Sequence, residues 1–152
     1  MKKIRLASAG ALIFDFVALT ILIGVLVMFC VMPNTFPFYG IIGAAILIAL
    51  CIVSLVLRFY FKLKFNYEDK SLSIVQFSVQ KINLLEIQNV AFYQATNNFA
   101  KASIEIVLLN GNIVNVNITG FGKKDTTKRA EQLAQLIADF SAYVKSQDQE
   151  EK

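Results

Sequence analysis

Two long apolar segments of the sequence each contain a single charged residue. Asp15 is the only one within residues 11–32, and Arg58 is the only one within residues 38–61. At 1.5 Å per residue the segments are about 33–36 Å long as helices, enough to cross a hydrocarbon core of about 30 Å. Residues 33–37 between them contain both prolines of the chain. The pattern predicts a transmembrane helical hairpin with spans at about 11–32 and 38–61.

The two charges lie at similar distances from the turn of this hairpin. A charge at the centre of a span costs about 2.5–3.5 kcal/mol, so it is normally paired or functional. Because the helices are antiparallel, Asp15 and Arg58 fall at similar depth, and we predict a structural ion pair. Two alternatives stay open: an aspartate at headgroup level beside a helix N-terminus, and a proton relay. A relay would require a second titratable group deeper in the span.

The remaining reactive side chains form no catalytic pattern. Cys30 and Cys51 are offset by about 15 Å along the hairpin axis, so no disulfide between them is expected. The sequence has no histidine, and Glu86 and Glu105 belong to separate predicted strands. Residues 120–127, Gly-Phe-Gly-Lys-Lys-Asp-Thr-Thr, lack the spacing of a phosphate-binding Walker loop. We therefore predict no enzymatic activity, no metal site and no cofactor.

Basic residues flank both ends of the apolar region, and the turn between the spans is uncharged. Lys2, Lys3 and Arg5 precede the first span, and Lys62 and Lys64 follow the second. Under the positive-inside rule this distribution predicts a multi-pass cell-membrane protein with both termini in the cytoplasm. Residues 62–152 carry 11 basic and 10 acidic side chains. That balance argues against a nucleic-acid surface, which needs a basic stripe.

Alternating hydrophobicity begins after the second span and predicts a small cytoplasmic domain over residues 62–145. Six strands are expected, at 64–68, 71–77, 81–85, 89–94, 103–109 and 112–118. The second strand changes face near Val75, which indicates a bulge or a strand covered on both sides. Asn110-Gly111 predicts a type I′ hairpin turn. A loop is expected at Asn97-Asn98.

One amphipathic helix is expected to close the domain. Asp125 is the predicted N-cap, and the apolar stripe of this helix consists of Leu133, Leu136, Ile137, Phe140 and Val144. Residues 146–152 are predicted to form a flexible tail. Residues 1–61 then comprise an N-terminal cytoplasmic stub and the hairpin.

Residues 81–90, Lys-Ile-Asn-Leu-Leu-Glu-Ile-Gln-Asn-Val, followed by Tyr93-Gln94, resemble the centre of the bacterial pleckstrin-homology-like (PH-like) domains. Many members of that family carry a pair of transmembrane helices before the domain. The resemblance implies an α+β fold, an antiparallel PH-like β-barrel or half-barrel with one C-terminal amphipathic helix. It also implies a binding or assembly module. The sequence departs from the family in showing six strands instead of seven, and in having Asn97-Asn98-Phe99-Ala100 where glycines are often found.

Two functions are therefore considered. The first is a protein-interaction or membrane-complex assembly role, with another membrane or cytoplasmic protein, or a second copy, as partner. Its expected site is the edge of the last strand, at Val114, Asn115, Val116 and Asn117. The alternative is recognition of anionic lipid headgroups. The expected contacts are Lys62, Lys64, Lys123, Lys124, Lys128 and Arg129.

Small residues spaced four apart mark possible close helix packing. The pairs are Gly40 with Ala44, Ala45 with Ala49, and Thr20 with Gly24. They can pack within the hairpin or against the helices of a partner.

Overall fold

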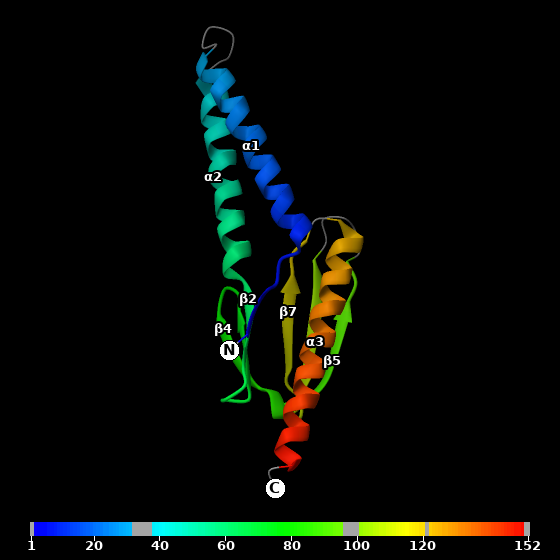
Figure 1. Cartoon of the computed structure of the whole chain (residues 1–152). Coiled ribbons are helices and arrows are strands. Elements are labelled where there is room, and N and C mark those ends of the chain that lie inside the picture. Colours follow the sequence, from blue (N-terminus) through cyan, green and yellow to red (C-terminus); the bar gives the residue numbers. More distant parts are fainter. Residues whose placement is uncertain (1, 32–37, 96–100, 121, 151–152) are drawn as a thin grey trace.

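The computed structural model describes residues 2–31, 38–95, 101–120 and 122–150. These form a helical hairpin that projects from a domain of two antiparallel sheets and one long helix (Figure 1). The predicted turn of the hairpin and the predicted loop at Asn97-Asn98 lie outside the described residues. The elements in chain order are β1 (Lys2–Arg5), α1 (Ala9–Val31), α2 (Phe38–Tyr60), β2 (Lys62–Asn66), β3 (Ser71–Val75), β4 (Val79–Asn83), a 3₁₀ turn η1 (Leu84–Glu86), β5 (Ile87–Tyr93), β6 (Ala102–Leu108), β7 (Ile113–Ile118) and α3 (Lys123–Glu150).

The helices α1 and α2 are long and apolar enough to cross a membrane. Only 6% of the apolar window of each is buried, unlike a core helix of a soluble domain. Ser8 caps α1, because its Oγ accepts a hydrogen bond from the Ala11 N–H at 3.2 Å. Figure 1 shows the two helices close together at the end away from the domain and diverging toward it.

The small residues of the hairpin divide between its inside and its surface. Ala44 is buried, and a Cβ built on Gly40 would lie 3.3 Å from the Phe29 ring. That pair therefore packs within the hairpin. Gly24 has no heavy atom within 4 Å of such a Cβ, and Ala45 and Ala49 are exposed.

The N-terminal residues predicted as a stub belong to the domain. β1 pairs antiparallel with β2, from Lys2 opposite Phe65 to Arg5 opposite Lys62. The next residue, Leu6, is fully buried in the core. The first sheet thus has the order β1-β2-β3-β4, and the hairpin is inserted between its first two strands. The expected boundary at residue 62 cuts through this sheet.

The second sheet has the order β5-β6-β7. Its hairpin at Asn110-Gly111 is present, but the predicted type I′ turn is wrong. That turn needs positive φ at both central residues, and among the described residues around it only Gly111 has one, at 81°. The Gly111 N–H donates to the Leu108 carbonyl at 2.9 Å. This geometry fits a type I turn followed by a left-handed glycine.

Two other local expectations also change. β3 ends at Val75 rather than at residue 77, and it is followed by a tight hairpin in which the Gln76 N–H donates to the Ser78 carbonyl at 3.1 Å. Val75 is buried, which agrees with a strand covered on both sides. The register shift in the sheets occurs elsewhere, in β5 between Ile87 and Asn89.

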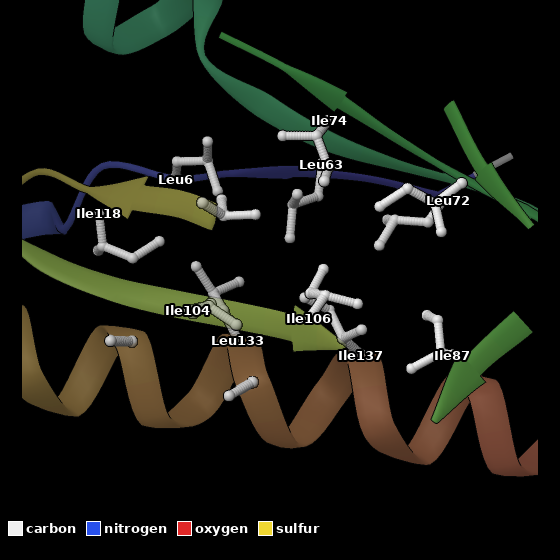
Figure 2. Close-up of a cluster of buried hydrophobic side chains, with 14 of the residues drawn as sticks. Leu6, Leu63, Leu72, Ile74, Ile87, Ile104, Ile106, Ile118, Leu133 and Ile137 are labelled. Atoms are coloured by element: carbon white, nitrogen blue, oxygen red, sulfur yellow. The ribbon is translucent and has the colours of Figure 1, made fainter. Parts of the chain in front are cut away.

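The core lies between the two sheets and α3. Figure 2 shows Leu63 and Leu72 of the first sheet facing Ile104 and Ile106 of the second, with Leu133 and Ile137 reaching in from α3. The helix packs mainly on β5, β6 and η1. In the described residues the strands remain two separate sheets, and neither closes into a barrel.

The ends of α3 differ from the prediction. The helix begins at Lys123, so Asp125 lies within its first turn instead of at the N-cap. It continues to Glu150, through most of the residues expected to form a flexible tail. Asp148 accounts for part of this extension, because its carboxylate lies 2.9 Å from the Lys70 ammonium. Residues 151–152 are outside the described residues.

Candidate functional site

The structure brings Asp15 and Arg58 together across the hairpin. Arg58 Nε lies 2.7 Å from Asp15 Oδ2, and the Ser54 hydroxyl donates to the same oxygen at 3.3 Å. Asp15 is 6% exposed. Ser54 was not anticipated, although it lies four residues before Arg58 and therefore on the same face of α2. Arg58 Nη1 is buried without a hydrogen-bond partner, so the guanidinium is not fully satisfied by this contact.

Two of the predicted lipid-contact residues, Lys62 and Lys64, form a basic face with residues of β1. Lys62 lies opposite Arg5, and Lys64 lies opposite Lys3. Like charges directly opposite one another destabilise a sheet. No carboxylate of the described residues forms an ion pair with any of these four side chains. Sequence reasoning used Lys3 and Arg5 only for orientation, and alternation over a four-residue strand is too short a signal to reveal them.

Aromatic rings hold the two cations of this face that lie nearest the hairpin. The Arg5 guanidinium lies 4.5 Å from the centre of the Phe59 ring, and the Lys62 ammonium lies 5.9 Å from the centre of the Tyr60 ring. Both rings belong to the last turn of α2. Cation–π contacts of this kind keep the charges beside the end of the apolar helix.

The other predicted lipid contacts, on α3, line two hollows that include neither Lys62 nor Lys64. Lys123, Lys124 and Lys128 line one hollow, which also contains Glu131. Lys128 also lines a second hollow, together with Arg129 and Arg5. Arg129 Nη2 donates to the Arg5 carbonyl at 2.7 Å, which ties this end of α3 to β1. The six residues therefore do not form one site.

Burial changes the electrostatics of Arg129. Desolvation lowers the pKa of its guanidinium, and the carboxylate of Asp125 offsets part of that effect. Arg129 Nε is buried and has no hydrogen-bond partner. The guanidinium is thus fixed in place by one backbone contact, while its charge is only partly compensated.

The predicted partner edge on β7 is half open. Asn115 and Asn117 are exposed, while Val116 is buried and Val114 is partly buried. The Asn117 carbonyl accepts a hydrogen bond from Gln76 Nε2 at 2.9 Å, and the Thr119 carbonyl accepts one from the Ser8 N–H at 3.1 Å. The end of the edge nearest the hairpin is therefore occupied.

The other half of the β7 edge has unpaired backbone groups. Backbone N–H and C=O groups alternate in direction along a strand. Because the carbonyls of Asn117 and Thr119 point away from β6, those of Ile113 and Asn115 do so as well. In the part of the chain that the structure describes, these outward groups have no backbone partner.

A second open edge faces this one. A groove of about 540 Å³ lies between β7 and β4, lined on the β7 side by Ile113 and Asn115 and on the β4 side by Lys81 and Asn83. The Leu84 N–H donates to the Lys70 carbonyl beside β3, so by alternation the backbone groups of Lys81 and Asn83 point into the groove. The neighbour of the β7 edge is not the C-terminal helix that follows it in the chain. Instead it is β4, because α3 packs mainly on the β5 side of the sheet.

Two acidic side chains of the sheets, Glu105 and Asp69, are engaged in local contacts. The Glu105 carboxylate beside Tyr93 raises the pKa of that phenol. Asp69 accepts from Asn66 at 2.8 Å and from the Lys81 ammonium at 3.3 Å. The residues that the structure describes contain no group of three or more Cys, Asp or Glu side chains placed to hold a metal ion.

The arrangement offers strand edges and cations, which are the elements of binding sites for extended peptides and for anions. No family model, curated protein or solved structure matches the chain.

Proposed function

We propose that this chain is a non-catalytic integral membrane protein whose PH-like domain binds an extended segment of a partner protein during assembly of a membrane complex. The observation that carries the proposal is the unpaired stretch of β7 at Ile113–Asn115, which faces the open edge of β4 across a groove. Exposed edges of this kind pair readily with an added strand. Lysine or proline, which would block pairing, is absent from β7.

The PH-like assignment is part of this proposal. The resemblance implies seven strands followed by a helix, and the domain has four strands in one sheet, three in the other, and then α3. β1 is the strand that was not among the six expected from the sequence. A fold of this type with a hairpin inserted after its first strand supports a role in presenting the domain at a membrane surface.

A site-specific crosslinking experiment tests the strand-addition site. A photoreactive residue at Ile113, which is 55% exposed, should give a discrete adduct with the partner in intact cells. Asn115→Pro removes one outward N–H without removing a hydrogen bond to β6, so the adduct should be strongly reduced. Asn115→Ala keeps the N–H and serves as the matched control.

A crosslinker at Tyr143 provides the spatial control, because that side chain is equally exposed but lies on α3. If the Asn115→Pro protein folds and its adduct at position 113 is undiminished, the β7 edge is not the binding site. An equal adduct from position 143 would indicate non-specific contact.

Location in the cell membrane with both termini cytoplasmic is also proposed. β1 and β2 pair with each other, so the two ends of the hairpin that join the domain lie on the same side. In a background with Cys30 and Cys51 replaced by Ala, a cysteine introduced at Thr35 should be labelled from outside intact cells. One introduced at Ser146 should be protected, and labelling of it would reverse the orientation.

Recognition of anionic lipid headgroups is the second candidate function. The basic face of Lys3, Arg5, Lys62 and Lys64 favours it, because two cross-strand pairs of like charge lie directly beside the end of α2. Each such cation contributes about 1 kcal/mol near an anionic leaflet. A fragment starting at residue 62 would lack β1, so the test uses the full chain. In nanodiscs, stabilisation by anionic lipid should weaken with salt and with Lys64→Gln.

A further inference from the structure

A hollow of about 410 Å³ lies at the base of α1, apart from the groove between β7 and β4, and it shares only Arg5 with the basic face. Its lining comes from three elements: Arg5 at the end of β1, the first turn of α1 from Ser8 to Leu12, and the part of α3 that carries Asp125, Lys128 and Arg129. Figure 1 shows the base of α1 next to the beginning of α3. The hollow therefore lies where the chain enters its first apolar helix.

The charges around this hollow do not balance. Three cations, Arg5, Lys128 and Arg129, face it with one carboxylate, Asp125. Lys128 is exposed, and no ion-pair partner is found for it among the described residues. Such an excess of positive charge around a concave surface attracts an anion.

The Arg129 guanidinium is anchored at one nitrogen and has a second nitrogen without a hydrogen-bond partner. Its Nη2 is anchored on the Arg5 carbonyl at 2.7 Å, while its Nε is buried without any partner. Burial of an incompletely paired guanidinium is costly, and burial lowers its pKa even with Asp125 nearby. An anion in the hollow would offset this cost by compensating the charge.

The first turn of α1 adds to the positive potential. Ser8 Oγ accepts a hydrogen bond from the Ala11 N–H. The N-terminal end of a long helix carries a partial positive charge. Because α1 is long and apolar enough to cross a membrane, its first turn would lie at the depth of lipid headgroups. A phospholipid beside α1 could place its phosphate in the hollow and its acyl chains along the helix.

We propose that the hollow between the base of α1 and α3 binds the phosphate group of an anionic phospholipid, with Arg5, Lys128 and Arg129 as its cationic contacts. The shared chemistry is that of a phosphate anion, and the lipid is the favoured source because of the position beside α1. This inference is independent of strand addition at β7. It rests on the second candidate function, recognition of anionic lipid headgroups, and gives that function a specific site that shares only Arg5 with the basic face.

The test uses the full-length chain purified in an uncharged detergent. Its thermal midpoint is followed while short-chain dihexanoylphosphatidylglycerol, dihexanoylphosphatidylcholine or sodium phosphate is titrated. Phosphatidylglycerol should stabilise the protein at much lower concentration than phosphatidylcholine. Lys128→Gln should weaken phosphatidylglycerol binding about fivefold, the effect expected for one cation near an anionic lipid.

Lys101→Gln is the matched control, since Lys101 is an exposed lysine of the same domain that does not line this hollow. It should bind phosphatidylglycerol as the unmodified chain does. Because Arg129 also anchors β1, Arg129→Gln is compared with Lys128→Gln only if its midpoint without lipid is unchanged. No such contact is found for Lys128 among the described residues, so the measurement on Lys128→Gln is sufficient by itself.

Three results would reject the site, and a fourth would change its ligand. Equal stabilisation by the two lipids, or equal affinity of Lys128→Gln and the unmodified chain, would reject the site. Loss of binding in Lys64→Gln but not in Lys128→Gln would move lipid recognition to the basic face. Sodium phosphate that matches phosphatidylglycerol in affinity and in its dependence on Lys128 would keep the anion site but replace the lipid by free phosphate.

Discussion

The hairpin of this protein buries a charged side chain at the contact of its two helices, whereas the domain buries a cluster of apolar side chains. Between α1 and α2, Asp15 meets Ser54 and Arg58, and Ala44 is buried as well, while most large apolar side chains of the helices face outward. In the domain the buried cluster is apolar, and cations and strand edges lie on the surface. In water, burial of apolar groups drives packing. Between helices in lipid that drive is lost, so close packing and polar contacts must act instead.

The difference predicts which substitutions damage which part. Core substitutions should lower the stability of the domain and leave the hairpin intact. Charge substitutions in the hairpin should do the reverse. β1 is the exception, because it precedes the hairpin in sequence but belongs to the first sheet.

Phe65→Ala should have the largest effect. Phe65 is fully buried, and its ring centre lies 4.9 Å from that of Phe140. The loss should be about 3–5 kcal/mol in the free energy of unfolding of the domain. Hydrogen exchange of the domain amides in the full-length protein measures it. Phe77→Ala, at an 86% exposed position whose ring centre lies 5.0 Å from that of Phe61, should cost only about 0.5–1.5 kcal/mol, and equal losses would contradict the core assignment.

Leu6→Ala should destabilise the domain by about 2–5 kcal/mol. Leu6 follows β1 directly, and its side chain is fully buried. Its substitution therefore tests whether β1 belongs to the sheet. Faster hydrogen exchange should appear in β2, the strand paired with β1. If exchange changes only in α1, the N-terminal segment is part of the hairpin and not of the sheet.

The hairpin ion pair should show coupling in a double-mutant cycle. Asp15→Asn and Arg58→Gln each leave one charge without its partner 2.7 Å away, so each should destabilise the packing of α1 on α2. The double substitution should cost less than their sum, with a coupling of about 1–3 kcal/mol. Steric-trap or force measurements of hairpin separation give the three values. Additive effects would show that the contact contributes nothing to hairpin stability.

Asp148→Asn should have the smallest effect. Its carboxylate pairs with the Lys70 ammonium at 2.9 Å, but both side chains are partly exposed, at 25% and 30%. Solvent-exposed pairs contribute about 0–1 kcal/mol. The change should therefore appear only as faster exchange in the last turns of α3. A loss of free energy as large as that for the Asp15–Arg58 pair would show that the exposed pair contributes as much as the buried one.

Sequence patterns were sufficient for the elements whose signals are long or local. The helices α1 and α2 follow from two long apolar runs. The strands β2 to β7 and the helix α3 follow from the periodicity of apolar residues, within a few residues of their observed bounds. Even the meeting of Asp15 with Arg58 could be predicted, because an antiparallel hairpin fixes which depths face each other. Each of these inferences depends on spacing along one segment or across one short turn.

The tertiary structure decided what depends on partners distant in sequence. β1 has only four residues, three of them basic, and it becomes a strand because β2, about sixty residues later, provides its hydrogen bonds and its apolar neighbours. That pairing places Arg5 opposite Lys62 and brings Arg5 to the hollow with Lys128 and Arg129. Which edges stay open was likewise settled by packing, since α3 lies mainly on the β5 side and leaves β4 and β7 facing a groove. Charge and hydrophobicity along the chain determine how much surface must be buried, but only the packed fold determines which cations and which backbone groups remain without partners.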